Sequence, residues 1–229
     1  MQLTFKEKTP AEGDVMTFVF TSSEPLEWLP GQFIHYTLPH KDADQRGDER
    51  WFTISSAPHE GDIRITTRIN SEYSSSFKQT LMAMKPGDTI EADIPEGDFT
   101  VDELTRDYVF VVGGIGITPF LSILKQLAHD GKEIRAELLY ANRDEASIPF
   151  KSELEAFSRQ HPGFKITYFI GDHYIDEAAL RSAGAKLNDP IYFVSGPEPM
   201  VEAFKTKLEG MGIDEAHSKF DYFPGYEAV

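Results

Sequence analysis

The chain has 229 residues, of which 40% are hydrophobic and 26% charged, as in globular proteins with one or two cores. It contains no cysteine, which excludes disulfides, thiolate zinc sites, cysteine nucleophiles and cysteine-ligated iron–sulfur clusters within these residues. Its formal net charge of −16 argues against nucleic acid as a partner, because such binding needs a basic surface.

The first hundred residues alternate short apolar runs with turn signals, which is typical of β-strands. Strands are predicted near residues 3–5, 15–19, 32–38, 51–55, 63–69 and 89–94. One short helix carries Phe77, Leu81 and Met82 and ends before Gly87. The polar segment 39–49 is predicted to be an exposed loop. Six strands and one helix in this length predict an antiparallel β-barrel.

The pattern changes at Tyr108, where strands and helices begin to alternate. Strands are predicted at residues 108–112, 135–140, 166–170, 191–195 and 220–223, with helices between them. This order predicts a five-stranded, doubly wound parallel sheet. Residues 92–107 have the character of a linker, so we expect a barrel domain at residues 1–104 and an α/β domain at residues 105–229.

The α/β domain opens with an apolar run that is followed by three glycines. Gly113, Gly114 and Gly116 come directly after the first strand, and Thr118 and Pro119 open the next helix. Glycines let the backbone bend and approach a bound group, while proline suits a first helical turn. Free amides at such a helix start attract phosphate. The stretch is either a nucleotide-binding turn or a structural turn.

A second group of polar residues belongs to the barrel. Alternation along the strand that begins at Arg50 places Arg50 and Phe52 on one face, and Trp51 and Thr53 on the other. The three serines at residues 74–76 form a hydroxyl-rich turn. One cation with three hydroxyls and free amides can hold a pyrophosphate. The same residues also fit a surface salt bridge and a plain loop.

Four stretches, in chain order, resemble motifs of the ferredoxin–NADP reductase superfamily. Residues 50–56, Arg-Trp-Phe-Thr-Ile-Ser-Ser, resemble its flavin motif Arg-x-[Tyr/Phe]-[Ser/Thr]-x-[Ser/Ala]-Ser. Residues 113–119 resemble its nicotinamide motif Gly-Gly-x-Gly-x-[Ser/Thr]-Pro. Residues 195–200 are similar to its Cys-Gly-Pro-x-x-Met strand end, and residues 221–226 to its aromatic C-terminal segment. The resemblance covers nearly the whole chain and implies a flavin-binding barrel followed by an NAD(P)-binding domain.

The resemblance also implies flavin-binding roles for residues of the barrel. Arg50 would pair with the flavin diphosphate, Phe52 would stack on the isoalloxazine, and Thr53 would place its hydroxyl near N5, the atom that accepts hydride. Further residues expected around the flavin are Trp51, Thr67, Arg68, Ser74, Ser75 and Ser76, the three serines on the phosphates. Phe223 or Tyr226 would cover the other face of the flavin.

The α/β domain would hold the dinucleotide. The residues implied are Gly113, Gly114, Gly116, Thr118, Pro119, Gly196, Pro197 and Met200. Thr118 and Ser195 would lie beside the nicotinamide, so that they and Thr53 form the expected catalytic set. Asn142 and Arg143 follow the second strand, where a 2′-phosphate would be recognised. Arg143 either binds that phosphate or pairs with a neighbouring acid, so the choice between NADH and NADPH stays open.

These expectations predict an FAD-dependent NAD(P)H oxidoreductase, with FAD expected rather than FMN. It would pass hydride from NAD(P)H to flavin N5, and then single electrons to a separate acceptor protein such as a ferredoxin, a flavodoxin or a haem protein. Phe52 replaces the usual tyrosine and Ser195 the usual cysteine. Those departures leave open a flavin-binding electron-transfer or sensor subunit with little turnover of its own.

Composition also bears on location and on metals. No segment resembles a signal peptide and no apolar stretch approaches the roughly 20 residues of a membrane helix, so a cytoplasmic protein without membrane insertion is expected. The seven histidines show no metal-binding spacing, and no metal is predicted. Acidic residues occur throughout the chain, which indicates solubility or, alternatively, a field that steers a basic partner.

Overall fold

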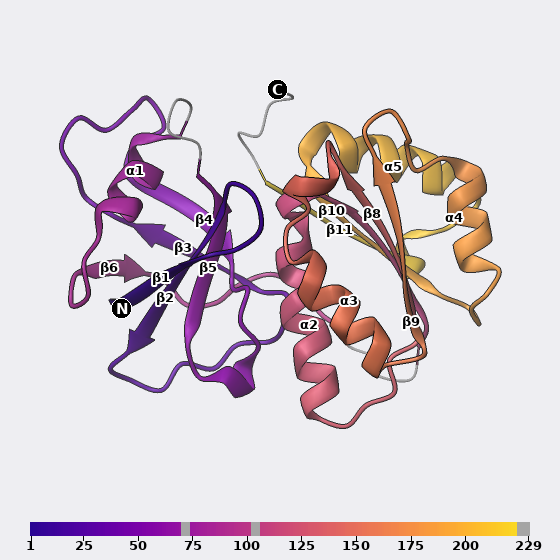
Figure 1. Cartoon of the computed structure of the whole chain (residues 1–229), viewed down its shortest axis with the longest axis horizontal. Coiled ribbons are helices and arrows are strands. Elements are labelled where there is room, and N and C mark those ends of the chain that lie inside the picture. The colour runs from indigo at the N-terminus through magenta and orange to yellow at the C-terminus, as the bar shows by residue number, and fades with distance from the viewer. Residues whose placement is uncertain (70–73, 102–105, 224–229) are drawn as a thin grey trace. The chain divides into compact units, whose positions relative to one another are not determined.

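The computed structural model describes residues 1–69, 74–101 and 106–223 (Figure 1). Contacts within the chain divide it into two units. The barrel unit comprises Met1–Thr100 and Thr118–Gln126, and the sheet unit comprises Val101–Ile117 and Leu127–Val229. In the described ranges, no helix has both the length and the apolar character that crossing a membrane requires.

The barrel unit is built on six antiparallel strands in the order β4-β3-β6-β1-β2-β5 (Figure 1). They are β1 (Gln2–Pro10), β2 (Val15–Ser22), β3 (Phe33–Thr37), β4 (Glu49–Thr53), β5 (Ile63–Arg68) and β6 (Thr89–Ala92). An isolated bridge between Ile54 and Ile65 joins the two outer strands, which closes the sheet. The predicted antiparallel six-stranded barrel is confirmed.

Alternation along these strands fills the barrel with aromatic and branched side chains. Phe5, Phe18 and Phe20 are almost wholly buried, as are Ile34 and Tyr36. Each such side chain contributes about 1.5–3 kcal/mol through burial. The predicted helix is α1 (Ser76–Ala83), and its apolar face adds two residues to the same core, Phe77 and Leu81.

The first nine residues of α2 (Thr118–His129) belong by their contacts to the barrel unit. The Ser122 hydroxyl donates to the carbonyl of Ser56 at 2.7 Å, and the rings of Phe99 and Phe120 meet edge to face with centroids 5.5 Å apart. The expected division at residue 104 therefore describes the order of the two sheets along the chain. As a domain boundary it stays a prediction.

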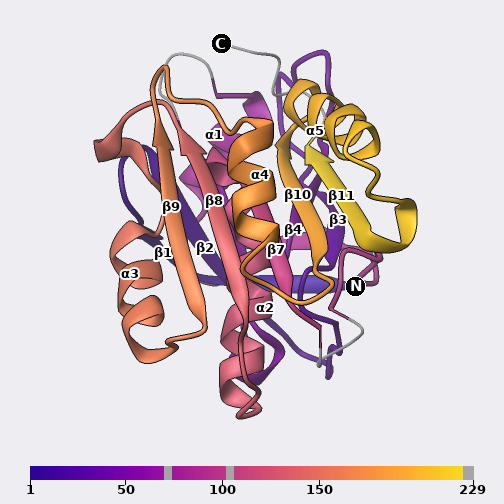
Figure 2. The same cartoon turned by 90° about the vertical axis from the view of Figure 1, so that its right-hand side faces the viewer.

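The sheet unit contains five parallel strands in the order β11-β10-β7-β8-β9. They are β7 (Tyr108–Gly113), β8 (Ala136–Asn142), β9 (Phe164–Ile170), β10 (Ile191–Pro197) and β11 (Ser218–Phe223). The helix α3 (Lys151–Gln160) lies on one face, while α4 (Glu177–Gly184) and α5 (Glu198–Gly210) lie on the other (Figures 1 and 2). The predicted doubly wound parallel sheet is confirmed.

The strand β7 occupies the centre of this sheet, and every one of its residues is buried. Its unbroken apolar run follows from that position, since helices cover both faces of a parallel sheet. The strand order reverses between β7 and β10, and the carboxyl ends of the strands at such a reversal are the usual ligand site of a doubly wound sheet. We call this place the switch point.

Candidate functional site

The strand β4 directs its side chains to two different surroundings, as the alternation predicts. The Phe52 ring lies with its centroid 5.8 Å from that of Phe77 in α1, and the Arg50 guanidinium lies 5.4 Å from the centroid of the same Phe77 ring. Trp51 instead stacks on His35, with ring centroids 4.4 Å apart, and 53% of it is exposed. The structure thus brings Arg50 and Phe52 to α1 and places Trp51 elsewhere.

A carboxylate from the loop between β3 and β4 lies between Arg50 and the start of α1. Asp44 Oδ1 is 3.3 Å from Arg50 Nη2 and accepts a hydrogen bond from the Arg46 amide at 2.9 Å. Asp44 Oδ2 accepts the amide of Ser76 at 3.0 Å, and the Asp44 amide donates to the Ser76 hydroxyl at 2.9 Å. Residues 39–49 are exposed or half-buried, in line with the exposed loop that was predicted, and Asp44 keeps 32% of its side chain exposed.

The charge of this cluster is fixed at neutral pH. Burial tends to raise the pKa of Asp44. Hydrogen bonds from the amides of Ser76 and Arg46 and the charges of the Arg50 and Arg46 guanidinium groups outweigh this effect, so the pKa is lower than its ordinary value. Arg50 also donates to the carbonyl oxygens of Arg46 at 2.8 Å and of Gly47 at 3.2 Å. Arg50 and the first turn of α1 are therefore a preformed anion site, which we call the cradle.

All three serines of the predicted phosphate turn belong to the start of α1. Ser75 is the N-cap, and its hydroxyl accepts the amide of Lys78 at 3.4 Å. Ser76 is the first helical residue, and the Ser74 carbonyl accepts the side-chain amide of Gln79 at 2.9 Å. A helix N-terminus offers unsatisfied amides and a positive dipole end, which favour an anion.

The remaining residues expected around the flavin lie on β4 and β5. Thr53 and Thr67 are buried, with 4% and 1% of their surfaces exposed. The Arg68 guanidinium pairs with Asp14, and the Arg68 carbonyl accepts the ammonium of Lys78 at 3.1 Å. Arg68 therefore links β5 to α1 through its backbone, while its charge is directed to Asp14.

The glycines after β7 serve close packing at the switch point. A Cβ on Gly116 would lie 2.4 Å from the carbonyl oxygen of Ser195, and one on Gly113 would lie 2.4 Å from the sulfur of Met200. Gly114 has a φ of +51°, in the left-handed region that favours glycine. These glycines let the turn after β7 meet the turn after β10 at backbone distance.

The other motif stretches meet at the same place. Ser195 is fully buried on β10, and its hydroxyl donates to Asp221 Oδ2 on β11 at 3.3 Å. Gly196 and Pro197 follow it, and the backbone of Pro197 is in register with Phe223. Three stretches far apart in the sequence therefore share one end of the sheet. The expected residue Tyr226 lies outside the described residues.

Thr118 and Pro119 open α2 directly after the turn at residues 114–117, and both are buried. Proline is thus in the first helical turn, as predicted. Asn142 is the last residue of β8, followed by the exposed Arg143. Both side-chain atoms of the Asn142 amide are buried, and neither has a hydrogen-bond partner in the part of the chain that the structure describes. Buried amides are rarely unpaired, so the Asn142 amide is a candidate contact for a ligand group.

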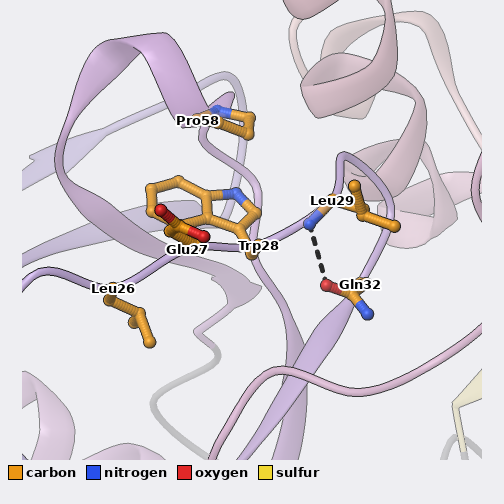
Figure 3. A pocket seen from close by; sticks show the side chains of 6 residues that line it. All are labelled: Leu26, Glu27, Trp28, Leu29, Gln32 and Pro58. Atoms are coloured by element: carbon orange, nitrogen blue, oxygen red, sulfur yellow. Dashed lines mark hydrogen bonds between the residues drawn. The ribbon is translucent and has the colours of Figure 1, made fainter.

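Away from these residues, the barrel has a cavity of about 520 Å³. Six residues line it: Leu26, Glu27, Trp28, Leu29, Gln32 and Pro58 (Figure 3). None of them is among the residues expected to bind a cofactor. Among residues 1–69, 74–101 and 106–223, no three histidine, aspartate or glutamate side chains are grouped to hold a metal ion.

Comparison with known proteins gives the same picture. Residues 110–206 match the family described as the oxidoreductase NAD-binding domain. The toluate 1,2-dioxygenase electron transfer component of Pseudomonas putida is 26% identical over an alignment 215 positions long, which covers 88% of this chain and 60% of that protein. The ferredoxin reductase component of 3-ketosteroid-9-alpha-monooxygenase from Rhodococcus rhodochrous is 28% identical over an alignment 235 positions long, gaps included, which covers 96% of this chain and 64% of that protein. The chain spans less than two thirds of each relative.

The flavohaem-like FAD/NAD-binding domain of nitric oxide dioxygenase from Vibrio cholerae aligns with a TM-score of 0.81 and 22% identity. The alignment covers 97% of this chain and 98% of that one. The chain shares the fold of ferredoxin–NADP reductase-like proteins. The resemblance predicted from four motifs is confirmed.

Two features of the site are not covered by the sequence motifs. Asp44 lies in a loop with several acidic residues, and no local pattern distinguishes it from them. Asp221 begins the predicted aromatic segment, but its contact with Ser195 depends on the register of β10 with β11. Strand pairing could have suggested the second contact, whereas the first depends on how the loop folds back.

Proposed function

We propose that the chain is an NAD(P)H-dependent flavoprotein oxidoreductase, with FAD on the barrel and NAD(P)H at the switch point. The observation that carries this proposal is the gathering of the motif residues. The cradle holds Arg50 beside Ser76, and the switch point holds Gly116 beside Ser195. The match of residues 110–206 to an NAD-binding family supports the second half.

The cradle fits the phosphate groups of a flavin nucleotide. The Asp44 carboxylate oxygens stand in for phosphate oxygens there, since they accept a helix amide and pair with a guanidinium. Phe52 lies beside Arg50 on the same face of β4 and would stack on the ring system. Bound flavin would supply the hydride acceptor and the ability to release electrons singly.

At the switch point the chain would orient the dinucleotide with backbone and uncharged side chains more than with charged groups. The turn at residues 113–117 would present backbone to the dinucleotide, and Thr118 and Ser195 would border the nicotinamide. Asn142 would offer its buried amide to the adenosine half, because it ends β8, the neighbour of β7 in the sheet. Thr53 would orient the flavin edge that receives hydride.

The acceptor is proposed to lie outside these 229 residues. The named functions of the relatives, an electron transfer component and a ferredoxin reductase component, support delivery of electrons to a partner. A ferredoxin, a flavodoxin or a haem protein would serve. A cysteine-ligated iron–sulfur centre would have to come from elsewhere, because this sequence has no cysteine. The cytoplasmic location stays a prediction.

Anaerobic titration tests the proposal. The protein, reconstituted with FAD, should retain flavin absorbance after dialysis, and NADH or NADPH should bleach it. Comparing the two reduction rates gives the dinucleotide preference, and an artificial one-electron acceptor then gives the turnover. Protein that stays colourless after reconstitution with FAD and with FMN contradicts the proposal.

A second candidate function is a flavin-binding electron-transfer subunit with slow reduction by nicotinamide. It is favoured by Ser195, whose hydroxyl donates to Asp221 at the position where the motif that residues 195–200 resemble has a cysteine. Retained flavin with slow reduction by both dinucleotides would support this alternative. Rapid turnover with an artificial acceptor would contradict it.

A further inference from the structure

We propose that Asp44 sets the flavin affinity of this protein, because its carboxylate competes with the flavin phosphate for the cradle. The inference rests on the proposed flavin site. Asp44 belongs to the loop of residues 38–48, between β3 and β4, and none of the motif stretches includes it. It is thus a further residue of the site, and it acts against the ligand.

The geometry of the carboxylate is that of a bound anion. Its Oδ1 has Arg50 Nη2 at 3.3 Å and the Arg46 amide at 2.9 Å, while its Oδ2 has the Ser76 amide at 3.0 Å. A guanidinium and the first amide of a helix are the donors that a phosphate uses. A phosphate bound to both donors would need the space and the charge that Asp44 occupies.

The loop is tied to the cradle by its backbone as well. The Asp44 amide donates to the Ser76 hydroxyl, and Arg50 Nη1 donates to the carbonyl oxygens of Arg46 and Gly47. Gly47 closes a turn by donating its amide to the Asp44 carbonyl at 2.9 Å. Binding of a phosphate to Arg50 and Ser76 would therefore move a loop that is held at several points.

Two negative charges bound to the same donors repel each other, which costs binding free energy. A phosphate and a carboxylate on one guanidinium lie within a few ångströms, where their repulsion is large and weakly screened. Asp48 contributes a further negative charge near Arg50. Removing the Asp44 charge should therefore free the cradle and strengthen flavin binding.

The same loop offers a matched control. Asp42 is exposed, and its φ of +57° lies in the left-handed region, which asparagine tolerates well. Asp42→Asn therefore makes the same change of net charge two residues away, without touching the cradle. Asp44→Glu keeps the competing charge and separates the effect of charge from that of side-chain identity.

The experiment measures the dissociation constant of FAD on full-length protein freed of flavin, at one fixed ionic strength. Asp44→Asn should bind FAD roughly tenfold more tightly than the native protein, the equivalent of one charge-assisted contact. Asp42→Asn should change the constant less than about twofold, and Asp44→Glu should stay near the native value. Equal or weaker binding by Asp44→Asn overturns the inference.

A measurement on the native protein covers the case in which Asp44→Asn fails to fold. Hydrogen exchange of the loop amides at residues 38–48 should rise when FAD binds, since the loop loses its contacts with Ser76 and Arg50. Unchanged exchange there overturns the inference while flavin binding itself stands. A native protein that binds no flavin at all would instead refute the proposed function, and this inference with it.

Discussion

The cradle and the switch point are both proposed to receive a nucleotide, yet they are held together by different forces. At the cradle, charged groups meet: Asp44, Arg50 and the N-terminus of α1. At the switch point, backbone meets backbone, because Gly116 leaves no room between its turn and Ser195. A substitution in the cradle should change the affinity for flavin, whereas a substitution at the switch point should disrupt packing and lower the unfolding free energy.

The largest expected effect is therefore steric. Gly116→Ala places a methyl group 2.4 Å from a backbone oxygen that no side-chain rotation can move, and we expect it to cost about 3 kcal/mol of unfolding free energy. Urea denaturation measures this cost. Gly210→Ala is the control, because nothing lies within 4 Å of its Cβ at the end of α5. Native stability in Gly116→Ala would show that the packing argument is wrong.

The next effect falls on the cradle. Arg50→Ala should weaken FAD binding by roughly 1.5–3 kcal/mol, on the order of ten- to a hundredfold, because it removes a charge-assisted contact. Equilibrium dialysis with FAD measures it. Arg159→Ala is the matched control, since it removes the same charge from an exposed position in α3 of the sheet unit. Undiminished flavin retention in Arg50→Ala would remove Arg50 from the site.

A smaller effect should appear at the pair of Ser195 and Asp221. Ser195→Ala leaves the carboxylate without this donor, and we expect a loss of about 1 kcal/mol in unfolding free energy. A double-mutant cycle with Asp221→Asn should give a coupling of similar size. FAD affinity should not change, because neither side chain is among those expected to contact the flavin. A coupling of zero would mean that the 3.3 Å contact contributes nothing.

The smallest expected effect is a change in stability at low pH, and it should distinguish the charged contacts of the barrel unit from the uncharged packing around Gly116. Burial acts to raise the pKa of Glu60 in the barrel unit, but the amide of Ala57 and the charges of Lys125 and Arg64 lower it below the ordinary value. Because the pKa of Glu60 is lower in the folded state, its contacts stabilise the folded protein. This stabilisation is fully present above the unfolded-state pKa of about 4.3 and is lost as the pH falls through the folded-state pKa.

Glu60→Gln should therefore flatten the acid arm of a stability profile measured by denaturation below about pH 4.5, by at most about 1 kcal/mol. Glu24→Gln, at an exposed position, should leave the profile unchanged. The uncharged packing around Gly116 should show no such dependence. An identical acid arm in the native protein and Glu60→Gln would contradict the expected contribution.

The sequence predicted what depends on local pattern. A buried strand at Tyr108–Gly113 is predicted because the stretch is an unbroken apolar run, and the barrel strands follow from alternation. Contacts between distant residues could not be predicted. The partner of Asp44 at Ser76 is 32 residues further along, and the sequence does not distinguish Asp44 from Asp42 or Asp48. The glycines after β7 predicted a tight turn, but the residues that pack against them belong to β10 and the start of α5 and could not be predicted.

The position of β6 bears on the order in which the barrel can form. It is the last of the six strands in sequence, yet it lies between β1 and β3, with Leu3 opposite Ile90 and Tyr36 opposite Ala92. During synthesis, β1 and β3 must therefore keep open edges until residues 89–92 arrive, and open edges pair readily with other chains. Such long-range pairing is slow. A nascent chain that stalls before residue 89 should thus be the species most prone to aggregate, whereas the second sheet starts from its central strand and adds neighbours outward.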